Sequence, residues 1–163
     1  MKIVGIIGYK DSGKTTLACV LAQKLTARGH QVAVVKHTSH HIDLAGKDTA
    51  TLLEAAGQVA IISTEAAGVF WRKPMSLEDI LTHLDADILL IEGFKGEQGY
   101  PKIACLRGLP DDRDLFAGSI VAAIGPTEQI GDLHIPVFDR DDVDLIADLV
   151  ERIQSAGIGS TTA

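Results

Sequence analysis

Cysteine, aromatic residues and long apolar runs are all scarce in this sequence, and each shortage excludes a class of protein. Cys19 and Cys105 are the only two cysteines in 163 residues, and they form no C-x-x-C pair. This spacing argues against a disulfide framework or a thiolate zinc site, so we expect both to be small core residues. Aromatic residues make up 4% of a chain that is 46% hydrophobic. A core of small aliphatic residues is typical of layered α/β proteins.

No apolar stretch approaches the ~18–20 residues that a membrane helix needs. Lys2 leads directly into a short strand-like run, so we expect no signal peptide. The net charge of −7 and the pI near 5.2 argue against a general nucleic-acid or membrane surface. We therefore expect a cytoplasmic protein with one domain over 1–156 and a flexible C-terminal tail over 157–163.

The spacing of apolar residues predicts strands and helices in alternation. We expect strands at 2–7, 31–35, 59–63, 87–91, 102–107, 119–124 and 135–138. We expect helices at 15–27, 47–57 and 76–84, and a final helix whose apolar face is Ile146, Leu149, Val150 and Ile153. This alternation predicts a single-domain, mainly parallel, doubly wound sheet with helices on both faces.

The segment "GYKDSGKT" matches the pattern G-x-x-x-x-G-K-[ST] at every fixed position and lies between a predicted strand and a predicted helix. In such a phosphate loop, glycines let the backbone approach phosphate oxygens, and the N–H groups at the helix start bind the anion. Lys14 would meet the β- and γ-phosphates and Thr15 would ligate Mg²⁺. We expect the Asp11 side chain to point away from the phosphates, towards solvent or a partner. The predicted nucleotide-binding residues are Gly8, Tyr9, Lys10, Asp11, Ser12, Gly13, Lys14, Thr15 and Thr16.

A magnesium–nucleotide site also needs an acidic residue at the end of a neighbouring strand. Glu92 follows the apolar run "ILLI" and precedes Gly93. Open α/β sheets place ligand contacts at the carboxyl ends of their strands, which is where Glu92 is predicted to lie. A glutamate here, in place of the usual aspartate, favours contact with the metal through water.

The segment "VVKHTSHHIDLAGKD" carries three histidines and follows the second predicted strand. Imidazole is a common metal ligand, but no fourth ligand at suitable spacing is evident. Its position favours a loop that orders around a γ-phosphate and Mg²⁺, with Asp43 as a further candidate for the metal. A plain surface loop with Asp48 capping a helix remains an alternative. The residues proposed for switching or for facing a cofactor are Lys36, His37, His40, His41, Lys47 and Asp48.

Together these segments, with "DILLIEGFKGEQGYPKI" and "IPVFDRDDVDLIADLV", resemble the molybdopterin-guanine dinucleotide biosynthesis adaptor (MobB) family. The resemblance implies a P-loop fold of the class that includes dethiobiotin synthetase and the nickel-insertion GTPases. It implies GTP and Mg²⁺ as cofactors, a homodimer, and a molybdenum cofactor guanylyltransferase as partner. Carried onto this chain, Lys95, Lys102 and Arg107 would form a basic patch for nucleotide or for molybdopterin.

The chain contains no asparagine, so it lacks the N-K-x-D motif with which many GTPases read guanine. Guanine specificity is therefore implied by the resemblance alone, with 126–129 ("PTEQ") as the candidate base-reading loop. No arginine finger and no water-orienting glutamine is evident, so the chain would be at most a slow GTPase, with no assigned catalytic residue. Two alternatives remain open, an ATP-dependent kinase or ligase and a metal-delivery GTPase.

Overall fold

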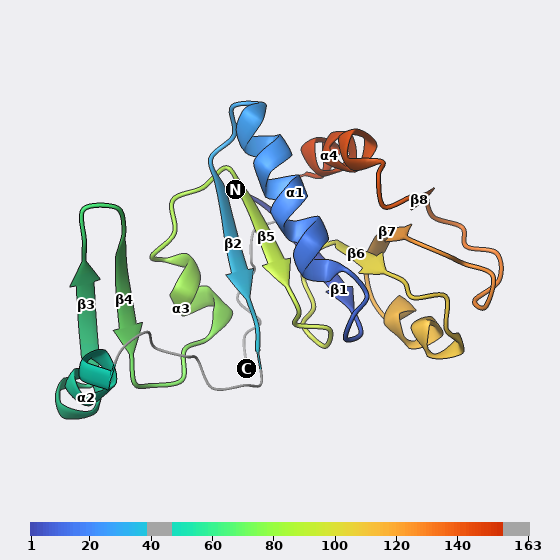
Figure 1. The fold of residues 1–163 in the computed structure, drawn as a ribbon. Coiled ribbons are helices and arrows are strands. Elements are labelled where there is room, and N and C mark those ends of the chain that lie inside the picture. Colours follow the sequence, from blue (N-terminus) through green and yellow to red (C-terminus); the bar gives the residue numbers. More distant parts are fainter. Residues whose placement is uncertain (39–46, 155–163) are drawn as a thin grey trace. The chain divides into compact units, whose positions relative to one another are not determined.

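The computed structural model describes residues 1–38 and 47–154, and its contacts divide the chain into two compact units (Figure 1). The larger unit comprises Met1–Thr38 and Leu84–Ala163, and the smaller one comprises Ser39–His83. His40, His41, Asp43 and the tail at 157–163 lie outside the described residues. The expectation of one nucleotide-binding domain over 1–156 stays a prediction.

The larger unit is built on a six-stranded sheet in the order β2-β5-β1-β6-β7-β8. Each pair of neighbouring strands in this sheet runs parallel. The strands are β1 (Lys2–Gly8), β2 (Val32–Lys36), β5 (Ile88–Glu92), β6 (Lys102–Cys105), β7 (Ile120–Ile124) and β8 (Val137–Phe138). The predicted fold class, a mainly parallel P-loop-like α/β sheet with helices, is confirmed.

Two helices, α1 (Lys14–Ala27) and α4 (Val143–Arg152), pack against the same face of this sheet (Figure 1). Leu21 of α1 and Ile146 of α4 are fully buried against strand residues such as Ile6. Each helix buries a stripe at the i, i+4 spacing of an amphipathic helix. No helix among residues 1–38 and 47–154 is long and apolar enough to cross a membrane.

The opposite face of the sheet carries the alternate strand residues, because successive side chains of a strand point to opposite faces. There Ile7 packs with Leu115 from a 3₁₀ helix, η1 (Pro110–Phe116). The buried Asp112 carboxylate accepts hydrogen bonds from the backbone N–H groups of Arg107, Gly108 and Leu109 at 2.7, 2.9 and 3.2 Å. Asp112 therefore holds the turn that leads from β6 into η1.

The smaller unit contains α2 (Lys47–Ala56), the strands β3 (Gln58–Ile62) and β4 (Ala67–Trp71), and α3 (Leu77–Leu81). The two strands form an antiparallel hairpin in which Gln58 pairs with Trp71. The Ser76 hydroxyl accepts a hydrogen bond from the Asp79 N–H at 3.1 Å and caps the start of α3.

The structure differs from the sequence-based expectations at three points. Strand β4 begins "AGV", which carries little β-signal, and it forms because the hairpin pairs it with β3. The 3₁₀ helix η1 was not expected, because its seven residues are too short for apolar periodicity. Cys105 is buried as expected, but Cys19 is exposed, since it lies outside the buried α1 stripe that contains Ala18.

Candidate functional site

The phosphate loop connects the end of β1 to the start of α1. The chain turns there through two left-handed residues, Asp11 with a φ of 62° and Gly13 with a φ of 84°. Glycine adopts this conformation without steric cost, which explains its fixed place before Lys14. Asp11 is exposed, as the sequence predicted.

The loop packs closely against the end of β6. Ser12 is fully buried, and a Cβ atom on Gly8 would overlap the Ser12 hydroxyl and lie 2.7 Å from the Cys105 carbonyl oxygen. Any side chain at position 8 would therefore push the loop away from the sheet. The first glycine of the motif is required by this close approach.

Arg140, which follows β8, also binds the phosphate loop. This residue was not identified from the sequence. Its Nη1 donates to the Ser12 carbonyl oxygen at 2.9 Å, and its Nη2 donates to the Leu106 carbonyl oxygen at 2.8 Å. A Cβ atom on Gly13 would overlap its guanidinium. An arginine between a strand and a helix at the carboxyl edge of the sheet is the signal that points to this role.

The start of α1 presents its backbone donors without a side-chain cap. The first N–H groups of a helix have no intrahelical partner, and the helix dipole adds a partial positive charge. Lys14 extends over the loop, where its ammonium donates to the Tyr9 carbonyl oxygen and lies 3.5 Å from the Ser12 hydroxyl. This arrangement suits a phosphate chain.

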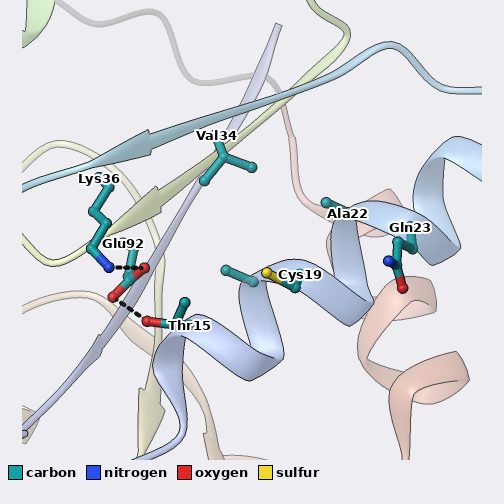
Figure 2. A pocket seen from close by; sticks show the side chains of 8 residues that line it. Thr15, Cys19, Ala22, Gln23, Val34, Lys36 and Glu92 are labelled. Carbon is teal, nitrogen blue, oxygen red and sulfur yellow. Dashed lines mark hydrogen bonds and ion pairs between the residues drawn. The ribbon is translucent and has the colours of Figure 1, made fainter. Parts of the chain in front are cut away.

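Glu92 lies beside Thr15, as its position at the end of β5 predicted (Figure 2). The Thr15 hydroxyl donates to Glu92 Oε1 at 2.8 Å, and the Lys36 ammonium lies 3.7 Å from Glu92 Oε2. The sheet order brings them together, because β5 pairs directly with β1. Hydroxyl and carboxylate oxygens are the ligand type that Mg²⁺ prefers, so this donor set fits the ion.

An open cavity of about 430 Å³ extends from this pair along α1, and we call it the α1–β2 groove (Figure 2). One end is charged, and the rest is lined by small or apolar side chains from α1 and β2 together with the polar Gln23. Its lining residues are Thr15, Ala18, Cys19, Ala22, Gln23, Val34, Lys36 and Glu92.

His37 is the one histidine of the 34–48 segment that the described residues include. Its backbone N–H donates to the Glu92 carbonyl oxygen at 2.9 Å, and the centroid of its ring lies 4.2 Å from that of the Phe94 ring. The start of the segment therefore lies at the carboxyl edge of the sheet, where β1 ends and the phosphate loop begins. Lys47 and Asp48 begin α2 in the smaller unit, and His40, His41 and Asp43 lie outside the described residues.

Lys95 and Arg107 meet at Tyr9, the second residue of the phosphate loop. The Lys95 ammonium lies 3.8 Å from the centroid of the Tyr9 ring, and the Arg107 guanidinium carbon lies 4.5 Å from it. Cations over an aromatic face are attracted by the negative potential of the ring. The structure thus brings two of the three expected basic residues together next to the loop.

Lys102 does not belong to a basic surface patch, contrary to the expectation from the sequence. Its side chain is fully buried, and its ammonium donates to the carbonyl oxygens of Lys95, at 3.0 Å, and of Glu97. Burial lowers the pKa of Lys102, while the Glu97 carboxylate opposes that shift. Lys102 therefore fixes the backbone of the turn that carries Lys95.

The Cys105 thiol at the end of β6 is buried, and no metal cluster is found within residues 1–38 and 47–154. Burial raises the pKa of Cys105 to about 11, so its thiol stays protonated at neutral pH. No group of three or more His, Cys, Asp or Glu side chains in that part of the chain is placed to hold a metal ion.

Comparison with known proteins agrees with this geometry. The family model described as "Molybdopterin guanine dinucleotide synthesis protein B" matches residues 3–124. A putative molybdopterin-guanine dinucleotide biosynthesis adapter protein of Methanocaldococcus jannaschii is 38% identical over 124 residues, which are 71% of this chain and 51% of that protein. The chain thus spans about half the length of that relative.

A probable adapter protein of the same description from Bacillus subtilis is 33% identical over 153 residues, 86% of each chain. The crystal structure of Bacillus subtilis MobB superimposes with a TM-score of 0.77 at 27% identity, over 94% of this chain and 99% of that one. The chain therefore belongs to the molybdopterin guanine dinucleotide synthesis protein B family.

Proposed function

We propose that this chain is a GTP-binding adaptor in molybdenum cofactor biosynthesis that assists a guanylyltransferase in forming molybdopterin guanine dinucleotide. Membership of the family supports the pathway, and the phosphate loop beside a Thr15–Glu92 pair supports the nucleotide. The hydrogen bond between these two side chains carries the proposal, because it places a magnesium-type donor pair at the end of a phosphate-binding loop.

In this proposal the phosphate loop at 8–16 holds the β- and γ-phosphates through its backbone N–H groups and Lys14. Thr15 would ligate Mg²⁺ directly and Glu92 would do so through water, and the ion would neutralise phosphate charge. Lys36, which lies against Glu92, balances that carboxylate and is placed to respond to the γ-phosphate. His37, bound to the Glu92 backbone, connects this point to the segment that carries His40, His41 and Asp43.

Hydrolysis by the isolated protein should be slow. Fast GTPases stabilise the charge of the transition state with an arginine and orient water with a glutamine. Arg140 lies next to the loop, but its two terminal nitrogens already bind the carbonyl oxygens of Ser12 and Leu106. We assign Arg140 to holding the loop, and we expect the protein to act by binding.

We assign the two cations above Tyr9 to a second anion, such as the phosphate of molybdopterin. Lys95 is exposed, whereas Arg107 is partly buried and also pairs with Asp111 at 2.7 Å and Asp112 at 3.3 Å. Lys102 would contribute by fixing the turn that presents Lys95. The working form would be a homodimer in the cytoplasm, with the molybdenum cofactor guanylyltransferase as partner. Sedimentation of the purified chain, alone and with that enzyme, tests both associations.

Competition between nucleotides tests the central proposal. A fluorescent guanine nucleotide is bound to the protein with Mg²⁺ and displaced with GTP or ATP. We expect GTP to compete at far lower concentration than ATP and turnover to be low. Equal competition, or rapid phosphate transfer from ATP to a small metabolite, would instead support a kinase or ligase of the same fold.

A further inference from the structure

A second cavity, of about 310 Å³, opens on the other side of the phosphate loop from the Thr15–Glu92 pair. We call it the α1–α4 cavity, because most of its wall comes from the start of α1 and the chain that enters α4. Its lining residues are Gly13, Thr16, Leu17, Val20, Cys105, Ile124, Arg140, Asp141 and Val143.

The cavity is continuous with the phosphate loop. Gly13 belongs to the loop and Thr16 to the first turn of α1, while Cys105 and Ile124 end the strands β6 and β7. Parallel sheets bind ligands at the carboxyl ends of their strands. A nucleotide whose phosphates lie on the loop, with its metal towards Glu92, would therefore extend its base into this cavity.

The chemistry of the wall suits a flat heterocycle. Leu17, Val20, Ile124 and Val143 supply apolar surface, and small-molecule sites of about 300 Å³ or more are mostly apolar with a few placed polar groups. The Arg140 guanidinium is held in place by its bonds to Ser12 and Leu106.

Asp141 supplies the polar group at the exposed rim. Its backbone carbonyl oxygen accepts the Val143 N–H at 2.8 Å, but its carboxylate forms no hydrogen bond or ion pair with any residue that the structure describes. Asp141 is the one Asp or Glu that lines the cavity. The nearby Asp142 carboxylate differs, because its Oδ2 accepts the Asp139 N–H at 2.9 Å. Asp139 does not line the cavity.

A carboxylate distinguishes guanine from adenine by hydrogen bonding. Guanine presents two adjacent donors, its N1–H and its 2-amino group, which match the two oxygens of a carboxylate. Adenine presents an unprotonated N1 and no 2-amino group, so the same carboxylate meets a lone pair. Residues 126–129, the loop expected to read the base, are not among those that line the cavity.

We infer that the α1–α4 cavity is the base pocket and that Asp141, from the segment after β8, selects guanine. The inference rests on the proposed binding of GTP at the phosphate loop. It explains how a chain without asparagine can recognise guanine. The carboxylate that contacts the base follows β8, whereas the sequence suggested a base-reading loop at 126–129, after β7.

The experiment replaces the Asp141 carboxylate with an amide or the whole side chain with a methyl group. Displacement of a fluorescent guanine nucleotide by GTP, ITP, XTP and ATP is measured for the full chain and for Asp141→Asn, Asp141→Ala and Asp139→Asn. Inosine lacks the 2-amino group, and xanthine carries an oxygen in its place. An asparagine amide can donate to that oxygen, so Asp141→Asn should weaken GTP and strengthen XTP.

We expect each effect to be roughly tenfold, the lower end for a bidentate contact to a base, because Asp141 is exposed. Asp141→Ala should weaken GTP without strengthening XTP, and Asp139→Asn, with the same change of charge, should leave the ratios unchanged. Partial unfolding of a variant would weaken the binding of every nucleotide, so it cannot produce tighter XTP binding.

The outcomes separate the two proposals. If the unmodified chain binds GTP no better than ATP, guanine recognition fails, and this inference fails with it. If the unmodified chain prefers GTP but Asp141→Asn leaves the GTP-to-XTP ratio unchanged, the proposed function stands and the assignment of Asp141 is overturned.

Discussion

The Thr15 hydroxyl donates to the Glu92 carboxylate across 2.8 Å, although 77 positions separate the two residues in the chain. Thr15 belongs to the phosphate loop and Glu92 to the end of β5. Parallel pairing of β1 with β5 places both at the same edge of the sheet. This pair carries the first testable prediction.

Glu92→Gln should weaken the effect of Mg²⁺ on GTP binding. Glutamine keeps an oxygen for the Thr15 hydroxyl but removes the charge that attracts the ion. We expect the Mg²⁺ concentration needed for half-maximal enhancement of GTP affinity to rise about 10- to 100-fold, as for outer-shell partners of other metal sites. Glu78→Gln replaces an exposed glutamate in the same way and is the control. Equal Mg²⁺ dependence in both variants would remove Glu92 from the metal site.

Lys14→Ala should lower the affinity for GTP more than the affinity for GMP. The lost ammonium faces the β- and γ-phosphates, which GMP lacks, and a charge-assisted hydrogen bond contributes about 1.5–3 kcal/mol, or roughly 10- to 150-fold in affinity. Calorimetric titration measures both. Lys73→Ala removes an exposed charge from the smaller unit and should have little effect. Near-normal GTP binding by Lys14→Ala would contradict the phosphate-loop assignment.

Gly13→Ala should disturb the loop through two separate causes. The residue has a φ of 84°, which disfavours any side chain, and a Cβ atom would overlap the Arg140 guanidinium. We expect a loss of stability of about 1–3 kcal/mol and loss of nucleotide binding. Chemical denaturation of Gly13→Ala, Arg140→Ala and the double variant completes a cycle. The double variant should be less destabilised than the sum, since the clash is then absent. Strict additivity would show that Arg140 does not contact the loop there.

Asp112→Asn should destabilise the turn into η1 in a pH-dependent way. Burial alone raises the pKa of Asp112, but hydrogen bonds from the backbone of Arg107, Leu109 and Gly108 and from the Arg107 side chain lower it below the ordinary 3.8. A carboxyl whose folded-state pKa is lowered stabilises the protein above its unfolded-state pKa, and this stabilisation is lost as the pH falls through the folded-state pKa.

At pH 7 we expect Asp112→Asn to cost about 1–3 kcal/mol, because three backbone donors lose their charged acceptor. The difference from the unmodified protein should shrink as the pH falls below about 3.8, the ordinary value. Urea denaturation at several pH values measures it. Asp114→Asn changes an exposed aspartate of the same helix and is the control. A difference that does not change with pH would mean that the charge of Asp112 contributes nothing.

Much of the fold could be predicted from the sequence, because local patterns of residues determine it. Apolar runs predicted β1 and β5 to within a residue or two, and the glycine motif predicted the turn between β1 and α1. Strand β4 was missed because its sequence has weak β-propensity and it depends on pairing with β3. Lys102 was read as a surface charge, since no local pattern shows that β6 is buried along its whole length.

The sequence by itself determined the glycine-rich turn from β1 into α1, because Gly8 and Gly13 act through local backbone geometry and Lys14 and Thr15 begin one helix. It also indicated Glu92, since an acid after a buried strand lies at the carboxyl edge of the sheet. Only the tertiary structure decided which distant residues complete the site. Arg140 binds the Ser12 backbone 128 positions away, and Asp141 lines the same cavity as Thr16. Such neighbours depend on the order of the strands in the sheet, and that order is fixed by packing of the whole unit.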